Sequence, residues 1–389
     1  MKKLFYSLIF LAALSSCDST PKGDFIVTVK NSADVDFSDE MVEIPMADLL
    51  SRLPLESEEV FYVVRDAKGN ELPTQISYDN NLMFPVTLKA HGTSIYSIAI
   101  GKPEPVTTAA FGRHYPERVD DIAWENDLTA YRCYGPALQA SGEKAFGYDI
   151  WVKNTPSMVV EERYANELYH SISYHVDHGN GMDCYKVGPT LGGGAAALLD
   201  GEEIVYPYCW ADYEIMENGP LRFMVRLTYN PFIYQGDTLV ETRIISLAKG
   251  SQLNRTTVSF SDMSKAAPLA AGIVIHSENP HAYTLAIDKG YISCQDLTDN
   301  VNAGNGEIYV GIVAPWAKDA YFQPFPAPEA ARRGASGHIL AEGTIAPDAS
   351  VTYWWGSAWS KAGWHSTDEW NDYLKDYATK VKTPLKVSY

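Results

Sequence analysis

Two stretches of the sequence gather side chains that can carry out acid–base chemistry. The first, residues 113–134, combines arginine, tyrosine and tryptophan with several carboxylates. The second, residues 169–186, contains His170, His175 and His178. Histidine exchanges protons near neutral pH, and arginine binds carboxylates through a planar fork of N–H donors. We therefore expect a site that binds an acidic ligand or moves protons on it.

Alternation along the first stretch predicts which side chains share a face. If residues 124–134 form one extended strand, residues of equal parity point the same way. That face carries an aromatic platform, an amide, a guanidinium and a phenol, supplied by Trp124, Asn126, Arg132 and Tyr134. This combination suits a sugar acid, and we add Glu125 and Asp127 as candidate ligand contacts. The alternative is a structural network in which Arg113, Arg118 and Arg132 pair with the neighbouring carboxylates.

In the second stretch, a predicted strand ends near Val176 and a glycine-bearing loop follows, where functional groups often lie. His175 is the candidate base, and Asp183 and Lys186 are candidate ligand contacts. The histidines and aspartates match no standard zinc or EF-hand spacing, so no metal ligand is assigned. No cofactor is assigned either, and Ca²⁺ is kept as a candidate ion.

Other polar and aromatic groups allow two interpretations each. A row of charged side chains on successive predicted strands forms either a basic surface that binds an acidic polymer or a solvated outer face. These residues are Arg222, Arg226, Glu241, Arg243 and Arg255. The tryptophans near the end of the sequence form either a stacking wall, with Trp355 as a ligand contact, or a core around a final helix. The glycine-rich residues 188–194 lack the GK[ST] of a phosphate loop, and no G-x-S-x-G elbow occurs.

The elements that must position these groups are strands. Residues 221–229 alternate apolar and polar side chains, and comparable runs follow without intervening helices. Such runs predict stacked antiparallel sheets, so the chain is predicted to be all-β. A small N-terminal β-sandwich is expected over residues 25–105 and a larger body over residues 106–389. Ser366 and Glu369 form a capping-box pattern that predicts one C-terminal helix.

Composition and the first residues narrow the class of protein. A net charge of −18 opposes binding to phosphate backbones, so no nucleic acid partner is expected. Residues 1–17 resemble a bacterial lipoprotein signal, with two lysines, a short apolar run and then Leu-Ser-Ser before Cys17. Lipidation of Cys17 would leave residues 18–24 as a tether and place the protein in the cell envelope, held to the outer membrane by lipid alone. The other four cysteines are predicted to be buried free thiols.

Four segments of the sequence resemble those of a known protein family. They are the lipoprotein start, residues 123–127, the loop at residues 188–195 and the Trp354-Trp355-Gly356 segment. The chain resembles an uncharacterised Bacteroidota lipoprotein family labelled as a domain of unknown function. Members of that family accompany pectin-degrading genes, which implies a glycan rich in uronic acid, but the family has no established catalytic residues. The body is also similar to the β-supersandwich of galactose mutarotases and polysaccharide lyases, an analogy of fold.

The leading hypothesis is a lyase that cleaves a uronic-acid glycan by β-elimination. Arg132 or Arg113 would neutralise the carboxylate, His175 would take the proton, and Tyr134 would protonate the leaving oxygen. Trp124 would be the sugar platform. A hydrolase would instead need two carboxylates, and a mutarotase-like epimerase would pair His175 with one. The alternative from another class is a glycan-binding lipoprotein without turnover.

Overall fold

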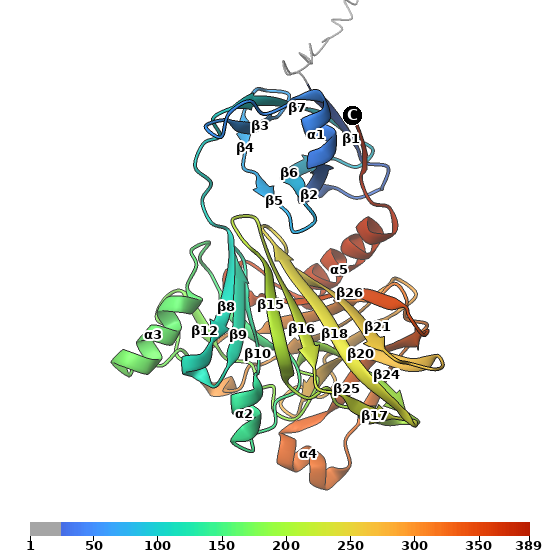
Figure 1. The fold of residues 1–389 in the computed structure, drawn as a ribbon. Helices are drawn as coiled ribbons and strands as arrows, with labels where there is room; N and C mark the ends of the chain where they lie inside the picture. The colour runs from blue at the N-terminus through green and yellow to red at the C-terminus, as the bar shows by residue number, and fades with distance from the viewer. Residues whose placement is uncertain (1–24) are drawn as a thin grey trace, which may run out of the picture.

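The computed structural model describes residues 25–389 and consists mainly of antiparallel sheets (Figure 1). The predicted all-β fold is thereby confirmed. The predicted signal peptide, Cys17 and the tether lie outside the described residues. None of the helices within residues 25–389 has both the length and the apolar character needed to cross a bilayer.

Two sheets and a short helix form the N-terminal part of the fold. One sheet has the order β27 (Lys386–Ser388), β1 (Phe25–Lys30), β7 (Thr93–Gly101), β3 (Phe61–Arg65) and β4 (Glu71–Leu72). The other has the order β2 (Phe37–Pro45), β6 (Asn81–Leu88) and β5 (Gln75–Ile76), and α1 spans Met46–Arg52. Their apolar faces share one core that includes Val27, Ile44 and Tyr62. The strand β27 reaches this sheet from the far end of the sequence.

Two facing sheets build the body of the protein. The nine-stranded sheet contains β15 (Trp210–Asn218), β16 (Arg222–Tyr229), β18 (Asp237–Ala248), β19 (Leu253–Ser261), β26 (Ser350–Trp359), β23 (Ile308–Val313), β22 (Tyr291–Asp296) and β21 (Tyr283–Ala286), with β17 (Phe232–Tyr234) paired to β18. The five-stranded sheet contains β14 (Glu203–Val205), β13 (Gly193–Asp200), β20 (Ala267–His276), β25 (Ala335–Ile345) and β24 (Asp319–Pro324). The predicted alternation holds in β16, where Phe223, Val225 and Leu227 are buried. Full burial of each such side chain contributes about 1.5–3 kcal/mol, which fixes the face that this strand presents to the core.

A further five-stranded sheet carries both predicted site stretches. Its order is β12 (Gly181–Asp183), β11 (Asp149–Lys153), β10 (Ala130–Cys133), β9 (Asp121–Asn126) and β8 (Ala110–Tyr115). One face packs into the main core, and the helix α3 (Val160–His170) covers the other with the loop that follows it (Figure 1). Burial of both faces makes every residue of β9, β10 and β11 buried.

Two predictions of local structure are wrong in this region. Residues 124–134 are not one strand, because the chain turns between β9 and β10 and pairs Tyr131 with Trp124. This register places Trp124 and Arg132 on opposite faces of the sheet. The predicted strand near Val176 is also absent, because α3 runs to His170 and turns follow it.

The predicted C-terminal helix is present as α5 (Thr367–Lys382), and the Ser366 hydroxyl accepts a hydrogen bond from the Glu369 amide at 3.1 Å. Its Trp370 and Leu374 pack on the nine-stranded sheet. Two shorter helices, α2 (Pro136–Ala140) and α4 (Ala327–Arg333), and three single 3₁₀ turns complete the described elements: Pro116–Arg118, Val301–Ala303 and Ser360–Ala362. The cysteines Cys133, Cys184, Cys209 and Cys294 are buried free thiols, as predicted.

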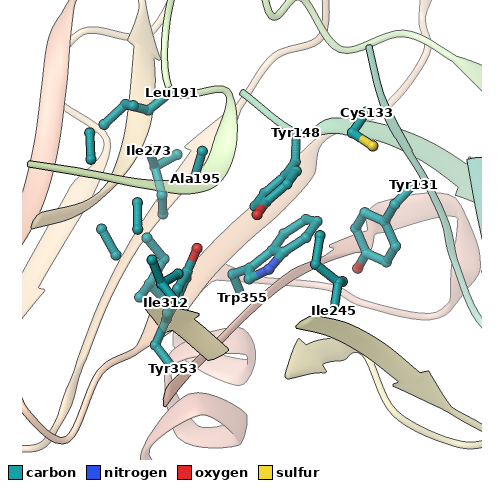
Figure 2. Close-up of a cluster of buried hydrophobic side chains, with 14 of the residues drawn as sticks. Tyr131, Cys133, Tyr148, Leu191, Ala195, Ile245, Ile273, Ile312, Tyr353 and Trp355 are labelled. Carbon is teal, nitrogen blue, oxygen red and sulfur yellow. The ribbon is translucent and has the colours of Figure 1, made fainter. Parts of the chain in front are cut away.

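The glycine-rich loop meets a fully buried tryptophan at the centre of the body. The Trp355 ring stacks on Tyr148 with ring centroids 4.1 Å apart and meets the edge of Tyr131 (Figure 2). Gly194 has φ +141°, and a Cβ atom there would lie 2.7 Å from the Cβ of Trp355. Glycine is therefore required for this close approach. The loop serves packing, and Trp355 is a core residue rather than the predicted ligand contact.

Candidate functional site

Arg132 lies at the centre of a buried cluster of carboxylates on the α3-covered face of the β8–β12 sheet. Its neighbours come from three other strands: Asp121 in β9, Asp149 in β11 and Asp183 in β12. Arg132 Nε donates to Asp149 Oδ2 at 2.8 Å and Nη2 donates to Asp183 Oδ2 at 2.9 Å. Asp121 Oδ2 lies 3.6 Å from Nη1. Since only 5% of Arg132 is exposed, its guanidinium is committed to these carboxylates.

Tyrosine hydroxyls surround the same guanidinium. The Tyr134 hydroxyl lies 3.4 Å from Arg132 Nη2, and the Tyr174 hydroxyl lies 3.4 Å from Nη1. The half-buried Arg118 also donates to the Tyr174 hydroxyl, from Nε at 3.0 Å and from Nη2 at 2.8 Å. Residues from the first stretch and from the loop after α3 thus meet at one place.

Burial changes the protonation of this cluster. Burial raises the pKa of Asp121 to about 6, against the attraction of Arg132. Burial and the nearby Asp149 carboxylate raise the pKa of Asp183 well above its usual range. Burial likewise raises the pKa of the Tyr134 hydroxyl, so Tyr134 keeps its proton at neutral pH while it accepts a hydrogen bond from Arg132.

His175 is the exposed member of this group. Its side chain is 51% exposed, and its Nδ1 lies 3.1 Å from the backbone oxygen of Asp183 and 3.6 Å from that residue's Oδ2. A carbonyl oxygen only accepts, so in the neutral ring Nδ1 carries the proton and Nε2 keeps its lone pair. The ring is therefore oriented to accept a proton at Nε2 on the protein surface.

Arg113 does not join this group. Its guanidinium lies over the Tyr115 ring and bonds to Glu117 at 2.6 Å and to Glu161 at 2.8 Å. Glu161 belongs to the first turn of α3, so this arginine ties α3 to β8. Arg113 therefore belongs to a structural network of ion pairs, because its guanidinium N–H groups bond to side chains of the protein itself.

The predicted contacts at residues 124–127 have structural roles. Trp124 is fully buried, and its Nε1 donates to Asn254 at 2.7 Å. Glu125 accepts from Lys153 and from the Val159 and Val160 amides, which holds the start of α3. Asn126 and Asp127 bond to the backbone of the β18–β19 turn, Asn126 to Ala248 and Ser251 and Asp127 to Gly250. Burial and these partners overturn the prediction that Trp124, Glu125 and Asn126 touch a ligand, and Asp127 is anchored to the same turn.

The two remaining residues predicted to contact the ligand, Asp183 and Lys186, lie in different parts of the structure. Asp183 lies in the Arg132 cluster, whereas Lys186 lies beside Gly334, at the end of α4. Within residues 25–389 no three histidine, cysteine, aspartate or glutamate side chains are grouped to hold a metal ion. The three aspartates of the cluster are instead arranged around Arg132.

The predicted row of arginines divides between two faces of the nine-stranded sheet. Arg222 and Arg226 form ion pairs with Glu217 and Glu214. Glu241 and Arg243 instead lie on the buried face of β18 and pair with each other at 2.5 Å. The alternation of side chains along the strands did not show that Glu241 and Arg243 point into the core rather than toward the outer face.

Sequence reasoning missed an aromatic group next to Tyr134. Phe146 packs against Tyr206 and Tyr208, with ring centroids 5.2 and 5.7 Å apart, and Tyr208 is 47% exposed. Phe146 and Tyr208 also line a small hollow together with Tyr134. We call Phe146, Tyr206 and Tyr208 the aromatic track. An exposed aromatic ring such as that of Tyr208 can stack on a sugar. The Tyr-Pro-Tyr sequence of residues 206–208 could have predicted this group.

Two proteins of Enterococcus faecalis are among the solved structures that are similar to this chain. An α-mannosidase from strain V583 has a TM-score of 0.49 and 10% identity, over 93% of this chain and 45% of that chain. A protein in glycosyl hydrolase family 38 has a TM-score of 0.49 and 10% identity, over 95% of this chain and 48% of that one. The chain thus spans less than half the length of either structure.

A curated protein from Formosa agariphila, "Uncharacterized protein P7", is 25% identical over 402 residues, which cover 98% of each chain. Residues 29–387 match a family model described as "Domain of unknown function (DUF4861)". This match confirms the predicted resemblance to a domain of unknown function. Because it spans nearly all of the described residues, the chain belongs to the DUF4861 family.

Proposed function

We propose that this protein is an envelope lipoprotein that cleaves uronic-acid-containing, pectin-type glycans by β-elimination. One observation carries the proposal: the exposed His175 ring is oriented by Asp183, which shares Arg132 with the proton-carrying Tyr134. A base and an acid on either side of the Arg132–Asp183 pair are the groups that elimination needs. The nearby aromatic track supplies surfaces on which sugar rings stack.

The proposed reaction assigns one proton transfer to each group. His175 Nε2 takes the proton from C5 of the uronate, and the electrons of that C–H bond form the C4–C5 double bond. The C4–O bond breaks, and its oxygen leaves with a proton from the Tyr134 hydroxyl. The products are an unsaturated uronate at one new end and a free hydroxyl at the other.

The proposed reaction needs a cation for the carboxylate of the substrate, and the contacts of the three nearby arginines support Arg118 in this role. Arg132 is enclosed by three aspartates, and Arg113 is engaged by two glutamates. Arg118 is half-buried, and within residues 25–389 its Nη1 makes no hydrogen bond. We assign carboxylate binding to Arg118, and Arg132 becomes the positioning residue for Tyr134 and Asp183.

A non-catalytic glycan-binding lipoprotein is the second candidate. The commitment of Arg132 to three carboxylates favours it, because such a network also serves stability alone. A hydrolase has less support. Of its five candidate carboxylates, Glu125, Asp149 and Asp183 are buried in bonds to cations, whereas the half-buried Asp120 and Asp127 pair with His114 and accept the Gly250 amide, respectively.

The test incubates the purified protein with polygalacturonate, rhamnogalacturonan and other uronate polymers, with and without Ca²⁺. The ultraviolet absorbance of unsaturated uronate is followed, and products are separated by size. Rising absorbance with shorter products supports the lyase. Binding of the same polymers without any absorbance supports the binding protein, and the absence of both overturns the proposed function.

A further inference from the structure

A second cavity lies beside the aromatic track, between β14 of the five-stranded sheet and β18 and β19 of the nine-stranded sheet. Its volume is about 340 Å³, and its aromatic walls are Tyr206, Tyr208, Tyr229, Phe232 and Phe260. Three polar side chains also line it: Gln139, Asn230 and Glu241. A mainly apolar cavity of this size with a few convergent polar groups is typical of a small-ligand site.

Glu241 is the buried charged group of this cavity, with 3% of its surface exposed. It lies on the inward face of β18, where the neighbouring residues of equal parity are Leu239 and Arg243. Its Oε1 accepts from Arg243 Nε at 2.5 Å. Within residues 25–389 no hydrogen bond reaches its Oε2, although Glu241 lines the cavity. Because Glu241 lines the cavity, this oxygen can accept a hydrogen bond from a ligand that occupies it.

Arg243 is not among the residues that line this cavity, so it cannot bind an anion there. It is fully buried and donates to the Tyr148 hydroxyl at 3.1 Å and to the Ala196 carbonyl at 2.8 Å. Its remaining Nε bond already goes to Glu241. The pair is therefore balanced in charge, and the group that faces the cavity is an acceptor of hydrogen bonds.

We propose that this cavity binds one neutral sugar residue, a hexose or 6-deoxyhexose. A pyranose has an apolar face that stacks on Tyr208 and hydroxyls that donate to Glu241. A uronate is disfavoured, because its carboxylate would approach the Glu241 carboxylate in a poorly solvated place. An amine is not required, because Arg243 already compensates the charge of Glu241.

The position of the cavity relates it to the proposed reaction. It shares Tyr206 and Tyr208 with the aromatic track, and it shares Gln139 and Tyr208 with the small hollow at Tyr134. A glycan in which a neutral residue neighbours a uronate would then occupy both places. This connection rests on the proposed function, whereas the ligand class of the cavity does not.

The test measures binding of monosaccharides to the full chain by ligand-observed NMR, which requires no turnover. The probes are methyl α-L-rhamnopyranoside, methyl β-D-galactopyranoside and the methyl glycoside of galacturonate. We expect at least one neutral probe to bind about tenfold more tightly than the uronate at neutral pH. Tyr208→Ala should weaken that binding about fivefold or more, and Glu241→Gln should reduce the preference for the neutral probe.

The matched control is Tyr78→Ala, because Tyr78 is also 47% exposed and does not line the cavity. If Glu241→Gln lowers the melting temperature, the exposed Tyr208→Ala variant decides the question. Equal affinity for uronate and neutral probes, no saturable binding of either neutral probe, or unchanged binding in Tyr208→Ala overturns the proposal. Loss of β-elimination with neutral-sugar binding retained would reject only the proposed reaction.

Discussion

The Nδ1 atom of His175 lies 3.1 Å from the backbone oxygen of Asp183. This contact fixes the ring tautomer and joins an exposed loop to the buried strand β12. His178 lies three residues further along the same loop and bonds through Nε2 to the Ser173 carbonyl at 2.9 Å. The two histidines are similar in sequence context and differ in their relation to the Arg132 cluster.

Replacing His175 with alanine should therefore abolish most turnover. If His175 is the base, His175→Ala should lower kcat on the best uronate polymer about 100-fold or more. His178→Ala should leave kcat within about twofold, because its ring does not contact Asp183. Initial rates of product absorbance measure both variants. Similar losses in the two variants would show that the loop, and not the His175 ring, matters.

Replacing Arg132 with methionine should strongly destabilise the fold. The change leaves Asp121, Asp149 and Asp183 buried without their shared cation, which costs about 3–5 kcal/mol. Arg226→Met is the control, because its ion pair with Glu214 is partly exposed and contributes at most about 1 kcal/mol. Urea unfolding gives the free energy of both variants. Equal losses would contradict a central role for Arg132.

The pKa of Asp121 predicts how stability depends on pH. Folding raises this pKa from 3.8 to about 6, so the folded protein holds the proton more tightly than the unfolded chain. The resulting stability is complete below about pH 4 and is lost as the pH rises through about 6. Relative to Asp121→Asn, the native protein should lose about 3 kcal/mol of unfolding free energy between about pH 4 and pH 7. Denaturant unfolding at several pH values measures this difference, and the exposed Asp200→Asn serves as control. A difference that stays constant with pH would refute the expectation.

Replacing Glu125 with glutamine should loosen α3 without affecting ligand binding. Its carboxylate accepts the Val160 amide at 2.8 Å and pairs with the buried Lys153 at 2.6 Å, so losing its charge should cost about 3 kcal/mol. Hydrogen exchange of the α3 amides should become faster, whereas Glu162→Gln on the exposed side of α3 should change little. Weaker glycan binding by the folded Glu125→Gln protein would restore this residue as a ligand contact.

Replacing Gly194 with alanine should damage the core around Trp355. The new Cβ would lie 2.7 Å from the Cβ of Trp355, so we expect a loss of about 3 kcal/mol from overpacking and strain. Gly201→Ala has a similar backbone penalty at φ +62° but meets nothing within 4 Å, and should cost about 1 kcal/mol. Thermal unfolding with near-ultraviolet circular dichroism compares the two. Equal costs would show that contact with Trp355 is unimportant.

The sequence predicted the structure correctly where the informative residues all lie within one strand or one turn of a helix. Alternation through Phe223, Val225 and Leu227 correctly predicted the buried face of β16, because the other face of that strand is more exposed. Ser366 and Glu369 correctly predicted the start of α5, because a capping box is local.

The sequence was less informative where both faces are covered or where several strands converge. Alternation could not show that Trp124 is sealed in the core, because the sheet that holds it is buried on both sides. The Asp-Leu-Thr turn after β9 has no glycine or proline to mark it. The carboxylates around Arg132 come from three other strands, and only the pairing register brings them together.

The pairing of β27 with β1 has a consequence for synthesis of the chain. Residues 386–388 complete a sheet whose first strand is residues 25–30, so that sheet stays unfinished until the intervening chain has been made. Until then β1 presents unpaired backbone groups along one edge, and such an edge is a template for pairing with another molecule. A chain that lacks residues 386–388 would therefore be prone to aggregate through the open edge of β1, the strand that is synthesised first. Chaperones would protect the chain best by covering this edge.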